Sequence, residues 1–295
     1  TEKLKWICAL LALAPIAAFA GQSVDKSWDI DANASVSIEN IAGEIVIQAW
    51  NRNEAQLTGE LGDSVEELEV DASKSRLQIS VKHRSERYSS NRYTDETRLK
   101  LMVPRGAGID AVGVSADISI SGMDNEKLSA NSVSGNVEVD AKSKWVSIES
   151  VSGDVAFEGE TGRISAESVS GDVDLSGISG EISATTVSGD MELEAGQIES
   201  AKLETVSGDI DMSGEVANNG RLTAESMSGD VTIILPAGQN GVFKAQSFSG
   251  RIGTDFGEVE DAGHGPGSYL KYVAGKGGAE IRVESFSGSI NLERN

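Results

Sequence analysis

The chain is poor in the residues on which most catalytic and metal sites depend. Its 295 residues include one cysteine, two histidines and four prolines, and aromatic side chains make up only 5%. A lone thiol excludes a disulfide framework and a cysteine-rich metal site. No H-E-x-x-H or G-x-S-x-G stretch occurs, so the common hydrolase motifs are missing. These absences argue against an enzyme.

Positive charge is also scarce. The chain has 25 Lys and Arg against 47 Asp and Glu, which gives a formal net charge of -22 at pH 7. Such a chain is repelled by nucleic acid and by anionic membrane surfaces. Cationic, neutral and divalent partners remain compatible with this charge.

A long apolar run is found only at the start of the chain. Lys3 and Lys5 precede an apolar stretch over residues 6–17, and Ala18-Phe19-Ala20 forms an A-x-A site. This pattern predicts a signal peptide over residues 1–20, cleaved between Ala20 and Gly21. The run is too short for a membrane anchor and contains Pro15. We therefore expect an exported protein, in the periplasm or at the cell surface, with no transmembrane segment after cleavage.

A short motif recurs along most of the chain, as in SVSGDV at residues 150–155 and again at 168–173. Its glycine returns at spacings of 18 residues, then 19 to 21, and finally 38. The recurrent glycines are Gly135, Gly153, Gly171, Gly189, Gly208, Gly229, Gly250 and Gly288. A fixed period with tolerated insertions indicates stacked structural repeats.

The positions around each glycine alternate between apolar and polar residues, as expected of half-buried strands. After Gly153, for example, Val155 and Phe157 are apolar, and before Gly171 so are Ile164 and Ala166. The residue two before each glycine, such as Val169, is also apolar but out of phase with Ile164 and Ala166. We expect these valines to plug the core at a corner where the register changes.

These patterns predict an all-β fold, a single-stranded β-solenoid (β-helix) with coils of roughly 18 residues and two strand-turn halves per coil. Residues 21–111 form an N-terminal β-sheet region that is continuous with the solenoid and caps it, with Gly43 in the place of the later glycines. Ala116 takes that place in the coil that begins at Val112. Residues 112–295 form the solenoid repeats, with a glycine-rich loop or hairpin inserted at 253–278. The last repeat, SFSGSINLERN, would end the solenoid, so the insertion or charge must cover its edge.

Several stretches together resemble the bacterial putative-adhesin family of exported β-solenoid proteins, a domain of unknown function. They are WDIDANASVSIENIAGEIVIQAW, LMVPRGAGIDAVGVSADISI, the Ser-Gly-Asp coils and ILPAGQNGVFKAQSFSGRI. The resemblance covers most of the chain after the signal. It implies an exported or envelope-associated solenoid and supplies no catalytic residues.

At the repeated corner, glycine permits backbone angles that a Cβ would oppose, and a β-bulge would fit nearly as well. An aspartate follows the glycine in five successive coils. These residues are Asp154, Asp172, Asp190, Asp209 and Asp230. Stacked about 4.8 Å apart they repel one another, which solvent, salt and bonds to turn amides can relieve. Weak Ca²⁺ binding between coils is the alternative; otherwise we expect no cofactor.

One basic, aromatic stretch stands out on the acidic chain, over residues 83–98. Its candidate partner-binding residues are Arg84, Arg87, Tyr88, Arg92 and Tyr93. The stretch is either a solvated hairpin tip or a contact for a glycan or an anionic partner, because Tyr and Arg are favoured at interfaces.

The sequence therefore favours a non-enzymatic exported β-solenoid, monomeric, that acts as a structural or adhesin-like interaction surface at the cell envelope. Its partner would be a protein or a glycan. One alternative is a β-helix enzyme that acts on polysaccharide, although acidic faces would repel a uronate substrate. Another is a self-assembling scaffold resembling the bactofilins.

Overall fold

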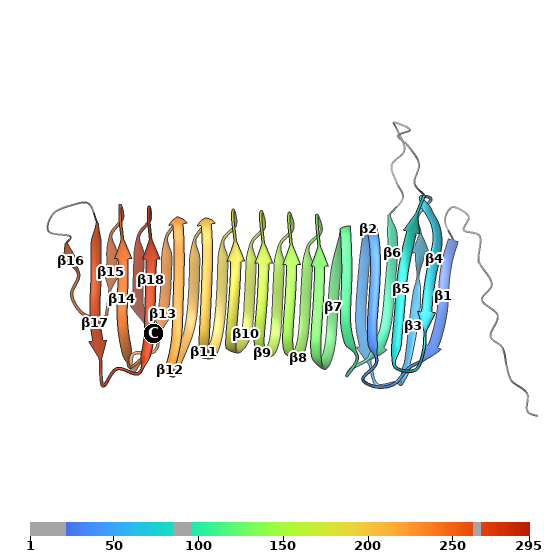
Figure 1. The fold of residues 1–295 in the computed structure, drawn as a ribbon, viewed down its shortest axis with the longest axis horizontal. Helices are drawn as coiled ribbons and strands as arrows, with labels where there is room; N and C mark the ends of the chain where they lie inside the picture. Colours follow the sequence, from blue (N-terminus) through green and yellow to red (C-terminus); the bar gives the residue numbers. More distant parts are fainter. Residues whose placement is uncertain (1–21, 85–95, 262–266) are drawn as a thin grey trace, which may run out of the picture.

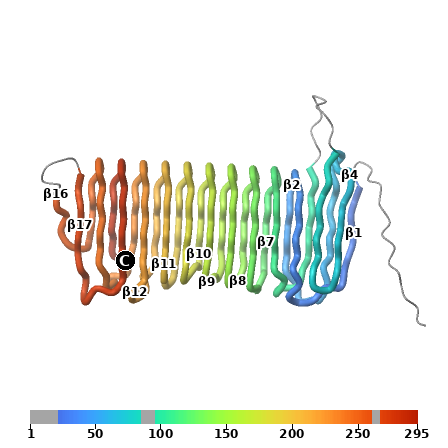
Figure 2. The backbone as a smooth tube through the Cα atoms, viewed as in Figure 1, coloured from blue at the N-terminus to red at the C-terminus, as the bar shows by residue number. Residues whose placement is uncertain are grey.

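The computed structural model describes residues 22–84, 96–261 and 267–295. These residues form nineteen strands and no helix, and all the strands belong to one mostly parallel sheet that winds into a long row of coils (Figure 1). The backbone traces a long stack of coils that stays regular from β7 to β12 (Figure 2). The predicted β-solenoid is confirmed. The predicted signal peptide, with Ala20 and Gly21, lies outside the described residues.

The strands of the N-terminal part are β1 Gln22–Asp29, β2 Ser35–Trp50, β3 Glu54–Leu61, β4 Val65–Ala72, β5 Arg76–His83 and β6 Thr97–Pro104. The regular coils are β7 Gly108–Ser132, β8 Val137–Ser150, β9 Val155–Ser168, β10 Val173–Thr186, β11 Met191–Ser207 and β12 Ile210–Ser228. The C-terminal strands are β13 Val231–Leu235, β14 Gly241–Ser247, β15 Ile252–Thr254, β16 Glu260–Asp261, β17 Ser268–Ala274, β18 Ala279–Ser285 and β19 Ile290–Arg294.

Each regular coil has two halves that lie on opposite faces of the stack. The half that follows a corner glycine forms the first face, and the half that leads to the next corner forms the second face. Neighbouring coils pair in register, as Val137 with Val155 and Val146 with Ile164. The alternating apolar columns point inward from both faces and are fully buried, which leaves no lumen. The inward columns that the sequence predicts are confirmed.

The corner between the second and first faces is tied by a buried row of hydroxyls. Ser168 Oγ donates to the Gly153 carbonyl oxygen at 3.2 Å, and Ser150 Oγ donates to that of Gly135 at 3.1 Å. Ser150 Oγ also accepts a hydrogen bond from the Gly153 N–H at 3.0 Å. Buried polar groups need hydrogen-bond partners. The hydroxyls supply partners to the backbone groups of the corner, so the chain can turn sharply beside an apolar core.

Glycine is required at this corner because the coils stack closely. A Cβ on Gly153 would lie 2.2 Å from the Gly135 carbonyl oxygen, and the later corner glycines show the same close approach. None of the eight recurrent glycines has a positive φ. The sequence-based reason, unusual backbone angles, is therefore wrong, and contact with the preceding coil replaces it.

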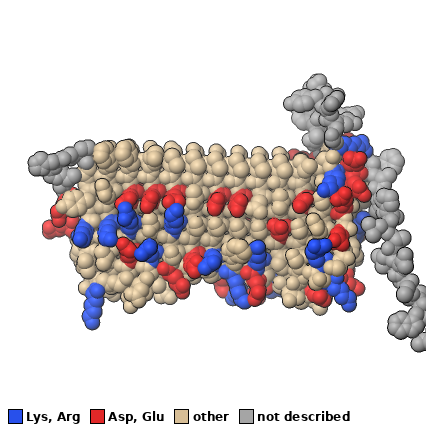
Figure 3. Space-filling model, viewed as in Figure 1, with Lys and Arg blue, Asp and Glu red and all other residues tan. Residues whose placement is uncertain are grey.

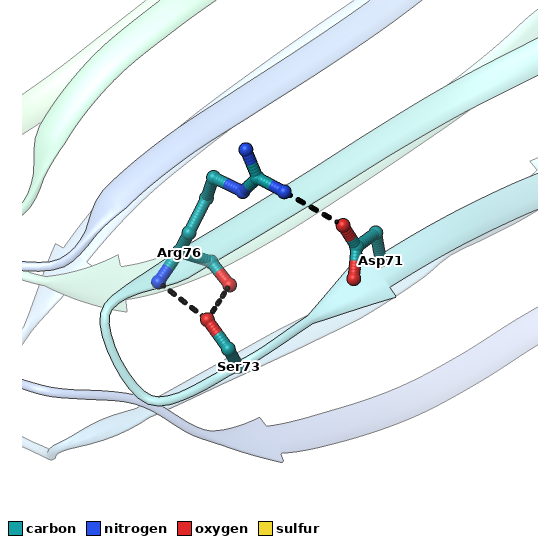
Figure 4. Close-up of polar contacts among 3 residues, drawn as sticks. All are labelled: Asp71, Ser73 and Arg76. Atoms are coloured by element: carbon teal, nitrogen blue, oxygen red, sulfur yellow. Dashed lines mark hydrogen bonds and ion pairs between the residues drawn. The ribbon is translucent and has the colours of Figure 1, made fainter.

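The N-terminal strands extend both faces beyond the first coil. The second face continues from β2 to β5 and the antiparallel β4, and the first face continues through β6, β3 and β1. Gly43 pairs with Ala116, as their matching sequence positions predict. The tight β4–β5 turn is held by Ser73, which bonds the Arg76 backbone, and by the Asp71–Arg76 ion pair at 2.9 Å (Figure 4).

At the other end, the order of coils in space differs from their order in the chain. β18 pairs with β12 on one side and β14 on the other, and β19 likewise lies between β13 and β15. The expectation that the last repeat ends the solenoid is therefore wrong, because residues 279–294 fill the place next to last. Within the insertion, β17 pairs antiparallel along all of β14, so it covers that edge strand.

Candidate interaction surfaces

An exposed apolar row runs along the corner edge of the solenoid, one side chain per coil. Its members, in spatial order, are Ile41, Val114, Val133, Val151, Val169, Val187, Val206, Met227, Phe286 and Phe248. We call this row the apolar ridge. The ten side chains are between 41% and 59% exposed, and they account for ten of the thirteen large hydrophobic side chains exposed in the described part of the chain.

The exposure of the ridge corrects the expectation that these residues plug the core. Val169 is 44% exposed, whereas the flanking Ser168 and Gly171 are buried at the corner. The buried hydroxyl occupies the inward position, so the next residue must point outward. The sequence pattern does not reveal this exposure, because the period-2 alternation of buried and exposed residues ends at the last strand residue, Ser168.

The row of aspartates follows the corner glycines on the first face, and its oxygens accept hydrogen bonds from the next coil. Asp154 Oδ1 accepts from the Asp172 N–H at 3.0 Å, and Asp172 Oδ1 accepts from the Asp190 N–H at 2.9 Å. The bonds continue through Asp209 and Asp230 to the Ser289 N–H. Each carboxylate thus satisfies a turn amide, one of the two roles that the sequence suggests.

The structure gives no support to a metal site at this row. Among the described residues, no three or more His, Cys, Asp or Glu side chains gather closely enough to hold a metal ion. Asn136 Oδ1 accepts from the Asp154 N–H at 3.0 Å, so a neutral side chain fills the same position. The interaction therefore requires an acceptor, not a charge, and weak Ca²⁺ binding stays an untested prediction.

Further along the first face, carboxylates border a shallow groove of about 430 Å³. Ala156 lies between Glu138 and Asp174 on successive coils, and its short side chain helps to form the hollow. Desolvation of the carboxyl raises the pKa of Asp174, and the charges of Asp172 and Asp154 raise it further. Because the environment of Asp174 already disfavours its negative charge, the groove is suited to neutral or cationic groups and opposes an anionic glycan.

The second face carries mixed charge. Below the uncharged edge, Figure 3 shows a row of acidic side chains, with basic and acidic side chains mixed beneath it. Ion pairs there include Lys202–Glu204 at 2.7 Å and Arg282–Glu284 at 2.7 Å. Such exposed pairs contribute little to stability, since solvent screens them. They do neutralise part of the acidic row.

The predicted basic patch can be placed only in part. Arg84 is exposed just after β5, and its N–H donates to the Ser64 carbonyl oxygen at 3.0 Å. Arg87, Tyr88, Arg92 and Tyr93 lie outside the described residues. Nearby, Ser64 Oγ lies 3.0 Å from His83 Nδ1, and burial lowers the pKa of His83. Within the described residues this pair has no carboxylate partner on His83 Nε2, so it does not form a triad.

A second groove, of about 780 Å³, lies at the opposite corner near the insertion, where Glu215 and Lys276 line it. Its buried amide, Gln239, is fully engaged inside the protein. Gln239 Oε1 accepts from the Val216 N–H at 3.0 Å, and its Nε2 donates to the Val216 carbonyl oxygen at 2.9 Å. The amide therefore ties the β13–β14 connection to strand β12 and does not point to a ligand.

Comparison with known families identifies the chain. The family model of Toastrack DUF4097 matches residues 33–293, from just before β2 to β19. The chain belongs to this family. Membership in the Toastrack DUF4097 family agrees with the β-solenoid and with the resemblance to putative adhesins; the family description assigns no activity. No curated protein matches the chain.

Solved structures similar to this Toastrack DUF4097 chain are distant in sequence. A protein of Bacteroides fragilis described as a putative adhesin is 13% identical, with a TM-score of 0.48, and the match covers 92% of this chain and 97% of that one. A Parabacteroides distasonis protein described as a putative lipid binding protein is 17% identical, with a TM-score of 0.47 and the same coverage. In the described residues of this chain, no helix is long and apolar enough to cross a membrane.

Proposed function

We propose that this Toastrack DUF4097 chain is a non-enzymatic, exported scaffold that presents an interaction surface to a protein or glycan partner at the cell envelope. The observation that carries the proposal is the stacking of coils in register, which repeats each outward position of the coil along the molecule. A rigid row of equivalent positions suits binding to an extended partner. Such a row is open to solvent, unlike the enclosed pockets in which small-molecule substrates usually bind.

The predicted signal sequence supports export, and the stack of hydrogen-bonded coils supports a structural role. Acidic rows and a capping strand at the β14 edge oppose end-to-end assembly of the kind that the bactofilin alternative requires. The charge of the first face likewise opposes an enzyme acting on acidic polysaccharide. A monomer in physiological salt, measured by light scattering, is the expected oligomeric state.

The test is affinity capture from an envelope extract, with residues 21–295 immobilised as bait. A matched bait lacking residues 85–95 tests whether the basic stretch contributes. We expect specific envelope components to be retained by the folded bait and lost when it is heat-unfolded. Cleavage of glycans from a panel of neutral and acidic polysaccharides by the same protein would contradict a non-enzymatic role.

Export itself is tested by fractionation. A reporter fused after residue 30 should leave the cytoplasm when residues 1–20 are present, and should stay there when Lys3 and Lys5 are both changed to Glu. Retention of both fusions in the cytoplasm would contradict the exported scaffold.

A further inference from the structure

The apolar ridge occupies one outward-facing position of the coil, and this position holds an apolar residue in every repeat. Other outward positions hold mostly polar residues and vary from coil to coil. The position after Val137, for example, holds Glu138, then Ala156, Asp174 and Glu192 in successive coils. Folding alone does not require this uniformity, since an exposed edge tolerates polar side chains.

The ridge is long and continuous. Ten side chains spaced by about 4.8 Å span roughly 43 Å. At its C-terminal end, the rings of Phe248 and Phe286 stack with centroids 4.9 Å apart and an interplanar angle of 6°. Contiguous apolar surface rimmed by polar groups marks interaction sites, whereas scattered exposed hydrophobic residues do not.

The borders of the ridge are hydroxyl groups and then carboxylates. An exposed serine follows each ridge residue in the regular coils, as Ser152 follows Val151 and Ser170 follows Val169. On one side lies the aspartate row that includes Asp172, and on the other lie glutamates such as Glu167. None of the ten ion pairs among the described residues involves Asp172 or Glu167.

This charge pattern selects among possible occupants. An anionic bilayer is repelled by both carboxylate borders. A second copy of the chain would bring four acidic rows together. A surface with an apolar stripe bordered by Lys and Arg instead gains from both the apolar contact and the charges. Figure 3 shows the uncharged edge directly above an acidic row, so the two features lie side by side.

We propose that the apolar ridge binds a polypeptide that carries an apolar stripe bordered by Lys and Arg side chains. The inference rests on the proposed scaffold function and names the surface and the partner chemistry that would serve it. Binding would bury the valines of the regular coils in the apolar stripe and pair the cations with the aspartate and glutamate rows.

The test uses a fluorescent, helical Leu/Lys peptide of about 28 residues with leucine on one face, titrated with residues 21–295 in physiological salt. Such a helix is about 42 Å long and therefore matches the ridge. The triple variant Val151→Thr, Val169→Thr and Val187→Thr keeps the branched shape and adds hydroxyls. The control variant, Val151→Ile, Val169→Ile and Val187→Ile, keeps the ridge apolar.

We expect the threonine variant to bind the Leu/Lys peptide at least tenfold more weakly than the unchanged protein, and the isoleucine variant to bind it as tightly. A Leu/Glu peptide should not bind. Circular dichroism checks that all three proteins are folded. Equal binding by the threonine variant would overturn the proposal, because charge alone would then explain the affinity.

Two other results would assign the ridge to a different partner. Ridge-dependent binding to phosphatidylglycerol vesicles, but not to the peptide, would assign the ridge to a membrane. Concentration-dependent dimerisation that the threonine variant loses would assign it to a second copy. The capture experiment distinguishes the ridge proposal from the scaffold function. If the unchanged and threonine-variant baits retain envelope components equally, only the proposed binding role of the ridge is contradicted.

Discussion

Gly171 stacks against Gly153 so closely that a Cβ on Gly171 would lie 2.2 Å from the Gly153 carbonyl oxygen. Backbone atoms of a hydrogen-bonded stack cannot move aside cheaply. We therefore expect Gly171→Ala to lower the free energy of unfolding by about 3 kcal/mol, at the upper end of what overpacking costs. The midpoint of urea unfolding measures the effect.

The matched control for this change is Gly162→Ala, at the other corner of the preceding coil. There a Cβ would meet its nearest atom, the Lys144 carbonyl oxygen, at 3.7 Å, which is ordinary contact. We expect a change within about 0.5 kcal/mol. A similar loss in both variants would show that glycine is needed for reasons other than close stacking.

Thr186 and Thr205 occupy equivalent corner positions in neighbouring coils but differ in their hydrogen bonds. Thr186 Oγ1 donates to the Gly171 carbonyl oxygen at 3.2 Å, whereas Thr205 Oγ1 is buried without a partner. We expect Thr186→Val to cost about 1 kcal/mol and Thr205→Val to be neutral or stabilising by up to about 1 kcal/mol. Equal losses in the two unfolding midpoints would refute a stabilising role for the hydroxyl bond.

Asp172 provides a hydrogen-bond acceptor for the next coil, and two substitutions separate this role from its charge. Asp172→Ala leaves the Asp190 N–H without its acceptor and should cost about 1 kcal/mol. Asp172→Asn keeps an acceptor, as Asn136 does, and removes repulsion of about 0.9 kcal/mol from a carboxylate 4.8 Å away in water. We therefore expect the Asn variant to be at least as stable as the unchanged protein.

The same row gives a direct test of calcium binding. Because the aspartate oxygens already bond turn amides, we expect millimolar CaCl₂ to leave the melting temperature unchanged relative to MgCl₂ or to NaCl at matched ionic strength. A calcium-specific rise that Asp172→Asn abolishes would establish the weak divalent site instead.

Asp174 predicts a defined pH dependence. Desolvation, and then the charges of Asp172 and Asp154, raise its pKa in the folded state. The folded protein therefore binds this proton more tightly than the unfolded chain, so the contribution of Asp174 to stability falls as pH rises through its folded pKa. Asp174→Asn should raise the melting temperature at pH 7 by roughly 1 °C. The difference should vanish below the unfolded pKa of about 3.9.

Much of the coil could be predicted from the sequence, because period-2 alternation decides which side chains of a strand are buried. Val155, Phe157, Ile164 and Ala166 are buried as expected. The alternation fails at the corner, where Ser168 turns inward to bond the preceding coil and Val169 turns outward. At this corner a polar row is buried and an apolar row is exposed, which is the opposite of what hydrophobicity alone predicts.

The order of the last coils could not be predicted for a different reason. The repeats around Gly250 and Gly288 have equivalent inward residues, such as Ile252 and Ile290, which pair with each other in register. Local sequence therefore fits either order. The connections between strands decide the order. The chain passes from β13 to β14, which lies two coils further along the stack, and then returns through β17 to β18, which fills the coil position left open.

Thermal unfolding of two variants of the same corner separates the residues that hold the stack from those that face a partner. We assign Gly171 to the stack and Val169 to a partner. This assignment predicts that Val151→Thr, Val169→Thr and Val187→Thr together shift the melting temperature by no more than about 2 °C, whereas Gly171→Ala alone lowers it by about 6 °C or more. An equal or larger loss in the threonine variant would contradict it, because the ridge would then be part of the scaffold.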